Sequence, residues 1–396
     1  MQAQVNIGML GHVDHGKTTL TKALTGKWTD THSEEIKRGI SIRLGYADAT
    51  IYKCTKCKKY VLTQKCSCGG KTELKRKISI VDAPGHETLM TTVIAASSIL
   101  DGAIFLIAAN EVCPQPQTAE HLIVLNSTGI KNIVIVQTKV DLVSKEKALE
   151  NYKQIKTFLK GSVAQDAPII PVAANYGLNM DALVGAIEEN IPNVNRDLNA
   201  SPVMYVSRSF DVNKPGAKIK DIGGGVLGGS IIKGKLKIGQ IIEIKPGIVR
   251  KEGAKATPID CEILSLREES ESLEEATPGG LIAVGTNLDP ALTKSDALVG
   301  SVIGLKGALT DAISTFNVKV ELLKRVDIQN PPLKDGEVLA INCYTATSLG
   351  VIAQLAKGGV ATIKSKKALV AEKGSRIAIS RRIGNRWRLG GWGTVV

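Results

Sequence analysis

The sequence has few aromatic residues and only short apolar runs. Phe, Trp and Tyr make up 4% of its 396 residues, whereas 43% are hydrophobic and 22% are charged. That balance is ordinary for a globular protein and excludes a globally disordered chain. The apolar run at residues 103–109 is too short to cross a bilayer, and the first residues show neither the basic nor the apolar part of a secretory signal. We therefore expect a cytoplasmic protein with no membrane partner.

Cysteine is scarce outside one short segment. Four of the seven cysteines lie within residues 54–68. In a cytoplasmic protein this usage argues against a disulfide framework. Acidic residues are also in deficit, because 51 Lys and Arg face 38 Asp and Glu, for a formal net charge of +13. Such an excess favours a polyanionic partner such as nucleic acid, without identifying it.

The pattern of apolar residues differs between the two halves of the chain. In residues 1–196, short apolar runs alternate with segments of helical periodicity. This alternation predicts an α/β domain with a mostly parallel sheet and helices on both faces. The expected strands are residues 5–10, 78–81, 103–108, 133–136 and 169–172, and the expected helices are 87–98, 117–128, 144–160 and 181–189.

After a linker near residues 192–202, short β-type runs separated by Gly, Pro and charged turns take over. Many short strands at close spacing are typical of β-barrels. The length and a break near residue 310 predict two barrels, at residues 201–310 and 314–396. The glycine run at 223–229 lacks a following Lys-Ser or Lys-Thr and is expected to be a hairpin with bulges.

A phosphate-binding loop occupies residues 11–18, between the first expected strand and a helix that opens at Lys17. Its glycines let backbone N–H groups surround phosphate oxygens. Lys17 can reach the outer phosphates, and the Thr18 hydroxyl can ligate Mg²⁺. We assign six residues of this loop and of the helix start to the nucleotide: Asp14, His15, Gly16, Lys17, Thr18 and Thr19.

The segment 82–86 follows a buried strand and supplies a second part of the site. Asp82, at the carboxyl end of that strand, suits water-mediated contact with Mg²⁺. Gly85 lets the backbone approach the γ-phosphate. His86 is the candidate catalytic residue, because it can orient a water in line with the γ-phosphorus.

The residues expected to recognise the nucleotide base follow two later strands, at residues 133–136 and 169–172. The Asp141 carboxylate can accept from N1–H and the exocyclic amine of guanine, which adenine does not offer, while Lys139 lies across the purine. Thr138 stands where many guanine-binding proteins have Asn. Ala173, Ala174 and Asn175 are placed to offer a backbone N–H to guanine O6. The predicted ligands are GTP and GDP with Mg²⁺.

These motifs resemble those of the translational GTPases, including elongation factor Tu. A closer resemblance is to the gamma subunits of archaeal translation initiation factor 2. It is carried by residues 37–47, 109–118, 208–216, 224–229, 278–281, 288–294 and 379–388.

The resemblance implies a carrier that brings methionylated initiator tRNA to the small ribosomal subunit, with GTP hydrolysis as its switch. It implies alpha and beta subunits as partners, and intrinsic hydrolysis that is slow and is stimulated by a partner or the ribosome. By the same resemblance, His86 is the catalytic histidine and Ser41 replaces a Mg²⁺-ligating Thr. Asp14 and the Gly39 carbonyl would ligate a second Mg²⁺, and Tyr46 would face the tRNA acceptor end.

Cys54, Cys57, Cys66 and Cys68 form a possible metal site within an insertion at about residues 53–70. Four thiolates can close a tetrahedral Zn²⁺ site, which a small insertion without its own core would need. The family carries a zinc knuckle at this place. A reduced, metal-free loop is the alternative. The insertion is also rich in Lys, and an Arg-rich segment with Trp387 and Trp392 near the C-terminus is a candidate for phosphate contact.

Two other functions fit the same motifs. One is an elongator-type carrier of other aminoacyl-tRNAs. The other is a non-hydrolysing scaffold that binds RNA through the cysteine-rich insertion and the basic regions.

Overall fold

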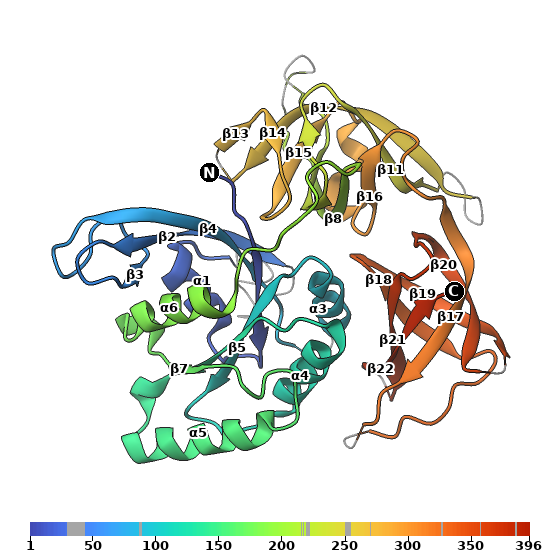
Figure 1. The fold of residues 1–396 in the computed structure, drawn as a ribbon. Coiled ribbons are helices and arrows are strands. Elements are labelled where there is room, and N and C mark those ends of the chain that lie inside the picture. The colour runs from blue at the N-terminus through green and yellow to red at the C-terminus, as the bar shows by residue number, and fades with distance from the viewer. Residues whose placement is uncertain are drawn as a thin grey trace. The chain divides into compact units, whose positions relative to one another are not determined.

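The computed structural model describes residues 1–29, 44–86, 89–214, 216, 218, 222–249, 255–269, 271–325, 328–356, 358–384 and 386–396. Its chain divides into two compact units, Met1–Asn195 and Arg196–Val396 (Figure 1). Ser41 and Gly39, the two expected magnesium ligands of the first switch, lie outside the described residues. Within the described residues, no helix is long and apolar enough to cross a membrane.

The first unit is built on a seven-stranded sheet of order β3-β2-β4-β1-β5-β6-β7. Neighbouring strands from β4 to β7 are parallel, whereas β2 and β3 are antiparallel to their neighbours. Every residue of β1, β5 and β6 is buried, as expected for strands covered on both faces. The strands are β1 Asn6–Gly11, β2 Gly45–Cys54, β3 Tyr60–Val61, β4 Thr72–Asp82, β5 Gly102–Ala108, β6 Ile133–Thr138 and β7 Ile169–Pro171.

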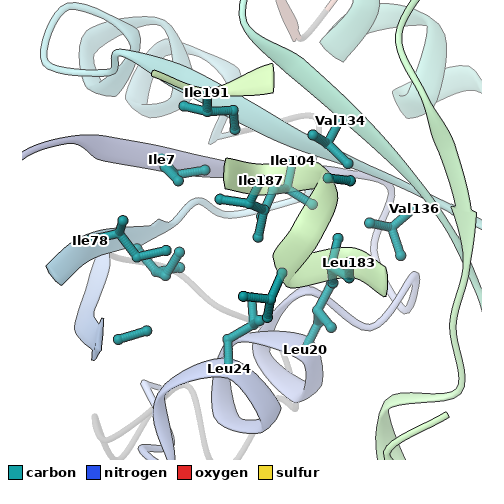
Figure 2. Packing of buried hydrophobic residues seen from close by; sticks show 14 of the residues in the cluster. Ile7, Leu20, Leu24, Ile78, Ile104, Val134, Val136, Leu183, Ile187 and Ile191 are labelled. Atoms are coloured by element: carbon teal, nitrogen blue, oxygen red, sulfur yellow. The ribbon is translucent and has the colours of Figure 1, made fainter. Parts of the chain in front are cut away.

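Helices alternate with these strands, which confirms the predicted α/β architecture. They are α1 Lys17–Thr25, α3 Met90–Ser97, α4 Pro116–Thr128, α5 Lys145–Leu159 and α6 Met180–Asn190, with short 3₁₀ turns η2 Val140–Leu142 and η3 Ala174–Tyr176. Leucines and isoleucines of α1 and α6 gather with those of the central strands in one buried cluster (Figure 2). Its burial anchors the first turn of α1, on which the phosphate loop depends.

The long strand β2 is the main element absent from the predicted list. Ala47, Ala49 and Ile51 are buried and the residues between them are partly exposed. This alternation is the period of a strand with one covered face, and it would have identified β2. Small alanines at two of the three inward positions weaken the hydrophobic signal.

The second unit contains two closed barrels, which confirms that part of the fold prediction. In the first, the order is β11-β16-β8-β9-β15-β12-β13, and pairing of β11 with β12 closes the ring. The strands are β8 Val203–Phe210, β9 Val226–Lys233, β11 Ile241–Ile248, β12 Thr257–Glu268, β13 Glu271–Leu273, β15 Ile282–Thr286 and β16 Val302–Leu305; β10 Leu236–Lys237 pairs with β14 Glu275–Ala276. The glycine run leads into β9, which forms a bulged antiparallel pair with β8.

The last barrel closes in the order β17-β20-β19-β18-β21-β22. Its strands are β17 Ala312–Leu322, β18 Val338–Cys343, β19 Ala346–Ala356, β20 Val360–Val370, β21 Arg376–Ile383 and β22 Arg386–Val395. Each barrel encloses its own hydrophobic cluster. The short 3₁₀ turns η5 Pro290–Leu292 and η6 Lys294–Asp296 precede β16.

Candidate nucleotide-binding site and cysteine cluster

The phosphate loop connects the end of β1 to the start of α1. Gly11 and Gly16 have φ angles of 143° and 85°, which glycine adopts readily and other residues rarely do. Gly16 is the N-cap of α1, and its carbonyl accepts the first helical hydrogen bond, from Leu20 N at 2.8 Å. The loop therefore presents the N-terminus of a helix, where backbone N–H groups favour an anion.

Lys17 folds back over this loop. Its Nζ donates to the carbonyls of Gly11 at 3.0 Å and His12 at 2.7 Å, and the residue is 6% exposed. These bonds hold the ammonium above the loop, where a phosphate would be. Thr18 and Thr19 follow in the first turn of α1 and are partly exposed.

The segment after β4 packs directly on the phosphate loop. A Cβ added at Gly85 would overlap Lys17 Nζ and would lie 2.9 Å from the backbone nitrogen of Val13. Only glycine fits this approach. Asp82, at the end of β4, is fully buried, and its Oδ2 accepts from the Thr29 hydroxyl at 2.6 Å. His86 is partly exposed, and its carbonyl accepts from Leu89 N at 2.9 Å.

The base-recognition segments lie at the ends of β6 and β7. Lys139 adopts a left-handed conformation, with φ 58°, immediately before η2, which contains the exposed Asp141. Ala173 is the N-cap of η3, which includes Ala174 and Asn175. All of these residues follow strands of the same sheet, so their loops emerge at its carboxyl edge with the phosphate loop.

Thr138 links the base-recognition segment to the phosphate loop. Its buried hydroxyl donates to the carbonyl of His15 at 2.8 Å. Thr138 is also predicted to contact the nucleotide. In the structure, the hydroxyl bonds to protein and fixes one loop against the other.

Three histidines near Lys17 differ in exposure and partners. The His15 ring lies 3.0 Å from the Leu106 carbonyl and 3.3 Å from Glu111, and burial lowers its pKa. The His12 ring is 5.1 Å from that of His15, and burial lowers its pKa too. The third, His121 on α4, was not anticipated. Burial, followed by the charge of Lys17, lowers its pKa to about 3.

Tyr46, expected to face tRNA, lies on β2 opposite Val81. Its ring is partly exposed but its hydroxyl is buried. Asp14 is exposed in the phosphate loop, with φ 62°.

The four clustered cysteines converge as the insertion folds. Their sulfurs all lie within 4.8 Å of one another, with Cys54–Cys68 and Cys57–Cys66 separations of 3.5 Å. A tetrahedral zinc site with Zn–S bonds of about 2.3 Å requires sulfurs about 3.8 Å apart, so the arrangement fits zinc. Backbone N–H groups, that of Cys57 foremost, lower the pKa of Cys54 to about 6 and favour its thiolate form. A Cβ at Gly70 would lie 2.7 Å from Cys54 Sγ, so this glycine makes room for the sulfurs.

The C-terminal basic segment contains residues of two kinds. Arg381 is buried and forms two bonds to Glu337, at 2.6 and 3.0 Å, so it stabilises the last barrel. Arg376 lies over the Trp392 ring, 4.6 Å from its centroid. Arg382 and Arg386 are exposed. Only part of this basic segment therefore offers charge to a partner.

A strand–phosphate loop–helix unit, a glycine packed on the loop and a Lys-x-Asp segment at the same sheet edge define a GTP-binding domain. With the two barrels that follow, they define a protein of the translational GTPase class. The family of the elongation factor Tu GTP-binding domain matches residues 2–193, and that of the C-terminal domain of initiation factor eIF2 gamma matches residues 314–395.

Comparison with known proteins identifies the family within this class. The chain is 56% identical to translation initiation factor 2 subunit gamma of Methanococcus maripaludis, covering 100% of this chain and 99% of that protein. It is 54% identical to the protein of that name from Pyrococcus horikoshii, covering 100% and 98%. The crystal structure of a bacterial selenocysteine-specific elongation factor, EF-Sec, superposes with a TM-score of 0.77 at 26% identity; the match covers all of this chain and 58% of that one.

The chain belongs to the translation initiation factor 2 gamma-subunit family. It is a GTPase of translation initiation, and this class implies GTP or GDP and Mg²⁺ as its ligands.

Proposed function

We propose that the protein carries methionylated initiator tRNA to the small ribosomal subunit while GTP is bound, and releases it after hydrolysis. The observation that supports this most strongly is full-length identity of 54–56% to archaeal gamma subunits, together with the nucleotide site described above. The word "subunit" in the relatives' names supports alpha and beta subunits as further partners. The three domains of this carrier would be residues 1–196, 201–310 and 314–396.

In the proposed site, the phosphate loop binds the nucleotide through Asp14, His15, Gly16, Lys17, Thr18 and Thr19. Thr18, Ser41 and, through water, Asp82 would hold Mg²⁺, and oxygen ligands of this kind suit that ion. Bound Mg²⁺ would neutralise charge on the β- and γ-phosphates. A second Mg²⁺ would use Asp14 and the Gly39 carbonyl.

Hydrolysis requires a water placed in line with the γ-phosphorus. We assign this role to His86, which is one residue beyond the glycine that touches the phosphate loop. The backbone of Gly85 would contact the γ-phosphate and so distinguish GTP from GDP. Guanine would be selected by Thr138, Lys139, Asp141 and the η3 segment, and the Thr138 hydroxyl would also fix their loop against the phosphate loop.

We also propose that the four cysteines bind one Zn²⁺. The sulfur spacing supports this, and a small insertion is commonly stabilised by such a metal site. The Lys59–Asp181 ion pair, at 2.7 Å, connects the insertion to α6. Tyr46 and the exposed arginines of the last barrel are proposed RNA contacts.

The decisive test compares equilibrium binding of initiator and elongator methionyl-tRNA to the GTP-bound protein. We expect clear preference for the initiator. Equal affinities would favour the elongator-type carrier.

A second test measures GTP turnover with and without the His86→Ala change, in the presence of small ribosomal subunits and partner subunits. We expect the change to abolish stimulated turnover. A near-zero rate that the change leaves unaltered would favour the non-hydrolysing scaffold.

A further inference from the structure

Glu111, in the segment that follows β5, has no role in the functions assigned above. Its Oε2 lies 3.3 Å from Nε2 of His15, a residue of the phosphate loop. The His15 side chain is 1% exposed and that of Glu111 is 29% exposed. The two residues are 96 positions apart in the chain. The contact therefore joins the loop after β1 to the segment after β5, the neighbouring strand of the sheet.

The two ring nitrogens of His15 both face acceptors. Nδ1 lies 3.0 Å from the Leu106 carbonyl, which can only accept a hydrogen bond, so Nδ1 donates. Nε2 then faces the Glu111 carboxyl group, which only accepts when it is ionised, so a hydrogen bond here requires the pair to share one further proton. Hydrogen bonds of this charge-assisted kind are stronger than those between neutral groups. Glu111 therefore holds the edge of the ring that Leu106 does not reach.

Asn151 of α5 fixes the backbone of Glu111. The Asn151 residue is 2% exposed, and its Nδ2 donates to the carbonyls of Glu111 at 2.8 Å and Ala108 at 3.3 Å. Its Oδ1 accepts from Gln137 Nε2 at 2.9 Å. A buried amide whose donors and acceptor all have partners is held in one orientation. Asn151 therefore gives Glu111 a defined position beside the phosphate loop.

His15 is thereby held at three points. Leu106 and Glu111 contact its ring, and the Thr138 hydroxyl donates to its carbonyl at 2.8 Å. The next residue, Gly16, is the N-cap of α1. A displacement of His15 would therefore move the backbone N–H groups at the start of this helix, where an anion is favoured.

We propose that Glu111 is a positioning residue for the phosphate loop, which it fixes through the His15 ring, and that Asn151 holds Glu111 in place for this task. The inference rests on the proposed function, in which this loop binds the nucleotide. Because the loop serves the phosphates that GTP and GDP have in common, Glu111 strengthens the binding of both nucleotides by the same factor.

The test measures affinities of the full chain for fluorescent GDP and a non-hydrolysable fluorescent GTP analogue, with Mg²⁺ present. Glu111→Ala removes the partner of the ring, and Glu111→Asp keeps the charge but is one methylene too short. We expect each to lower both affinities by about tenfold, the effect of losing one hydrogen bond. Glu111→Gln keeps the length and can donate to Nε2, so it should stay within about threefold of wild type. Glu150→Ala, which removes an exposed acid on α5, is the control and should leave both affinities unchanged.

A second comparison shows whether Glu111 acts through His15. In a His15→Leu protein the ring nitrogens are absent, so adding Glu111→Ala should lower neither affinity further. A further loss as large as that in the wild-type background would overturn the inference. So would unchanged affinities in a folded Glu111→Ala protein, a loss confined to one nucleotide, or a Glu111→Gln protein as weak as Glu111→Ala. If Glu111→Ala does not fold, Glu111→Asp decides by the same criteria.

Failure of the proposed function would look different. The nucleotide affinities of the variants would then change as expected, whereas the wild-type protein would bind initiator tRNA equally well with the GTP analogue and with GDP.

Discussion

The hydrogen bond from Thr138 to His15 predicts how one hydroxyl supports the nucleotide site. Thr138→Val keeps the branched shape of the side chain and removes only the donor to the His15 carbonyl, now 2.8 Å away in a buried setting. The loss of a partner by a buried carbonyl costs about 1–3 kcal/mol. At about 1.4 kcal/mol per tenfold, affinity should fall by between about fivefold and about a hundredfold if the loop bears the whole cost.

Because the phosphate loop and the base segment serve both nucleotides, GTP and GDP affinities should fall by the same factor. Stopped-flow dissociation and equilibrium titration with fluorescent nucleotides would measure it. Thr128→Val is a matched control, since its hydroxyl donates to Leu125 at 3.2 Å within the last turn of α4. Unchanged affinity for both nucleotides, or a loss confined to GTP, would refute this reasoning.

Three further predictions concern metal, packing and pH. Cys66→Ser should lower bound zinc, measured by mass spectrometry of the purified protein, from about one ion per chain to almost none; a full complement would contradict the four-sulfur site. Arg76→Ala should cost about 3–5 kcal/mol in urea unfolding, because it leaves the buried Glu188 carboxylate unpaired. The exposed Lys59→Ala should cost much less, and equal costs would contradict this difference. Between pH 6.5 and 3, His121 is protonated in the unfolded protein but stays neutral in the folded protein. The free energy of unfolding should therefore fall as the pH falls. At pH 5 the loss relative to pH 7 should be about 2 kcal/mol, and His121→Gln should reduce it; identical pH profiles would count against the buried neutral ring.

The sequence predicted those parts of the fold whose signals are local. Apolar runs locate the buried parallel strands because burial on both faces leaves little room for polar residues. The motifs after those strands then fall at one sheet edge by topology. Strand β2 is absent from the expected strands because the small alanines at its buried positions give a weak hydrophobic signal.

The remaining features depend on residues far apart in the chain. Thr138 and His15 are 123 positions apart, and Arg381 and Glu337 are 44 apart. No local pattern marks such pairs, so the sequence does not predict the protein partners of Thr138 and Arg381. His121 carries a clue in its own helix, since it and Thr118 share one face at a spacing of three residues.

In the proposed function, the bound nucleotide controls the affinity of the protein for initiator tRNA. The most direct measurement is the affinity of one protein preparation for methionylated initiator tRNA, first with a non-hydrolysable GTP analogue and then with GDP. We predict tighter binding with the GTP analogue by at least about tenfold, which corresponds to about 1.4 kcal/mol. Equal affinity in the two nucleotide states would contradict a GTP-controlled tRNA carrier.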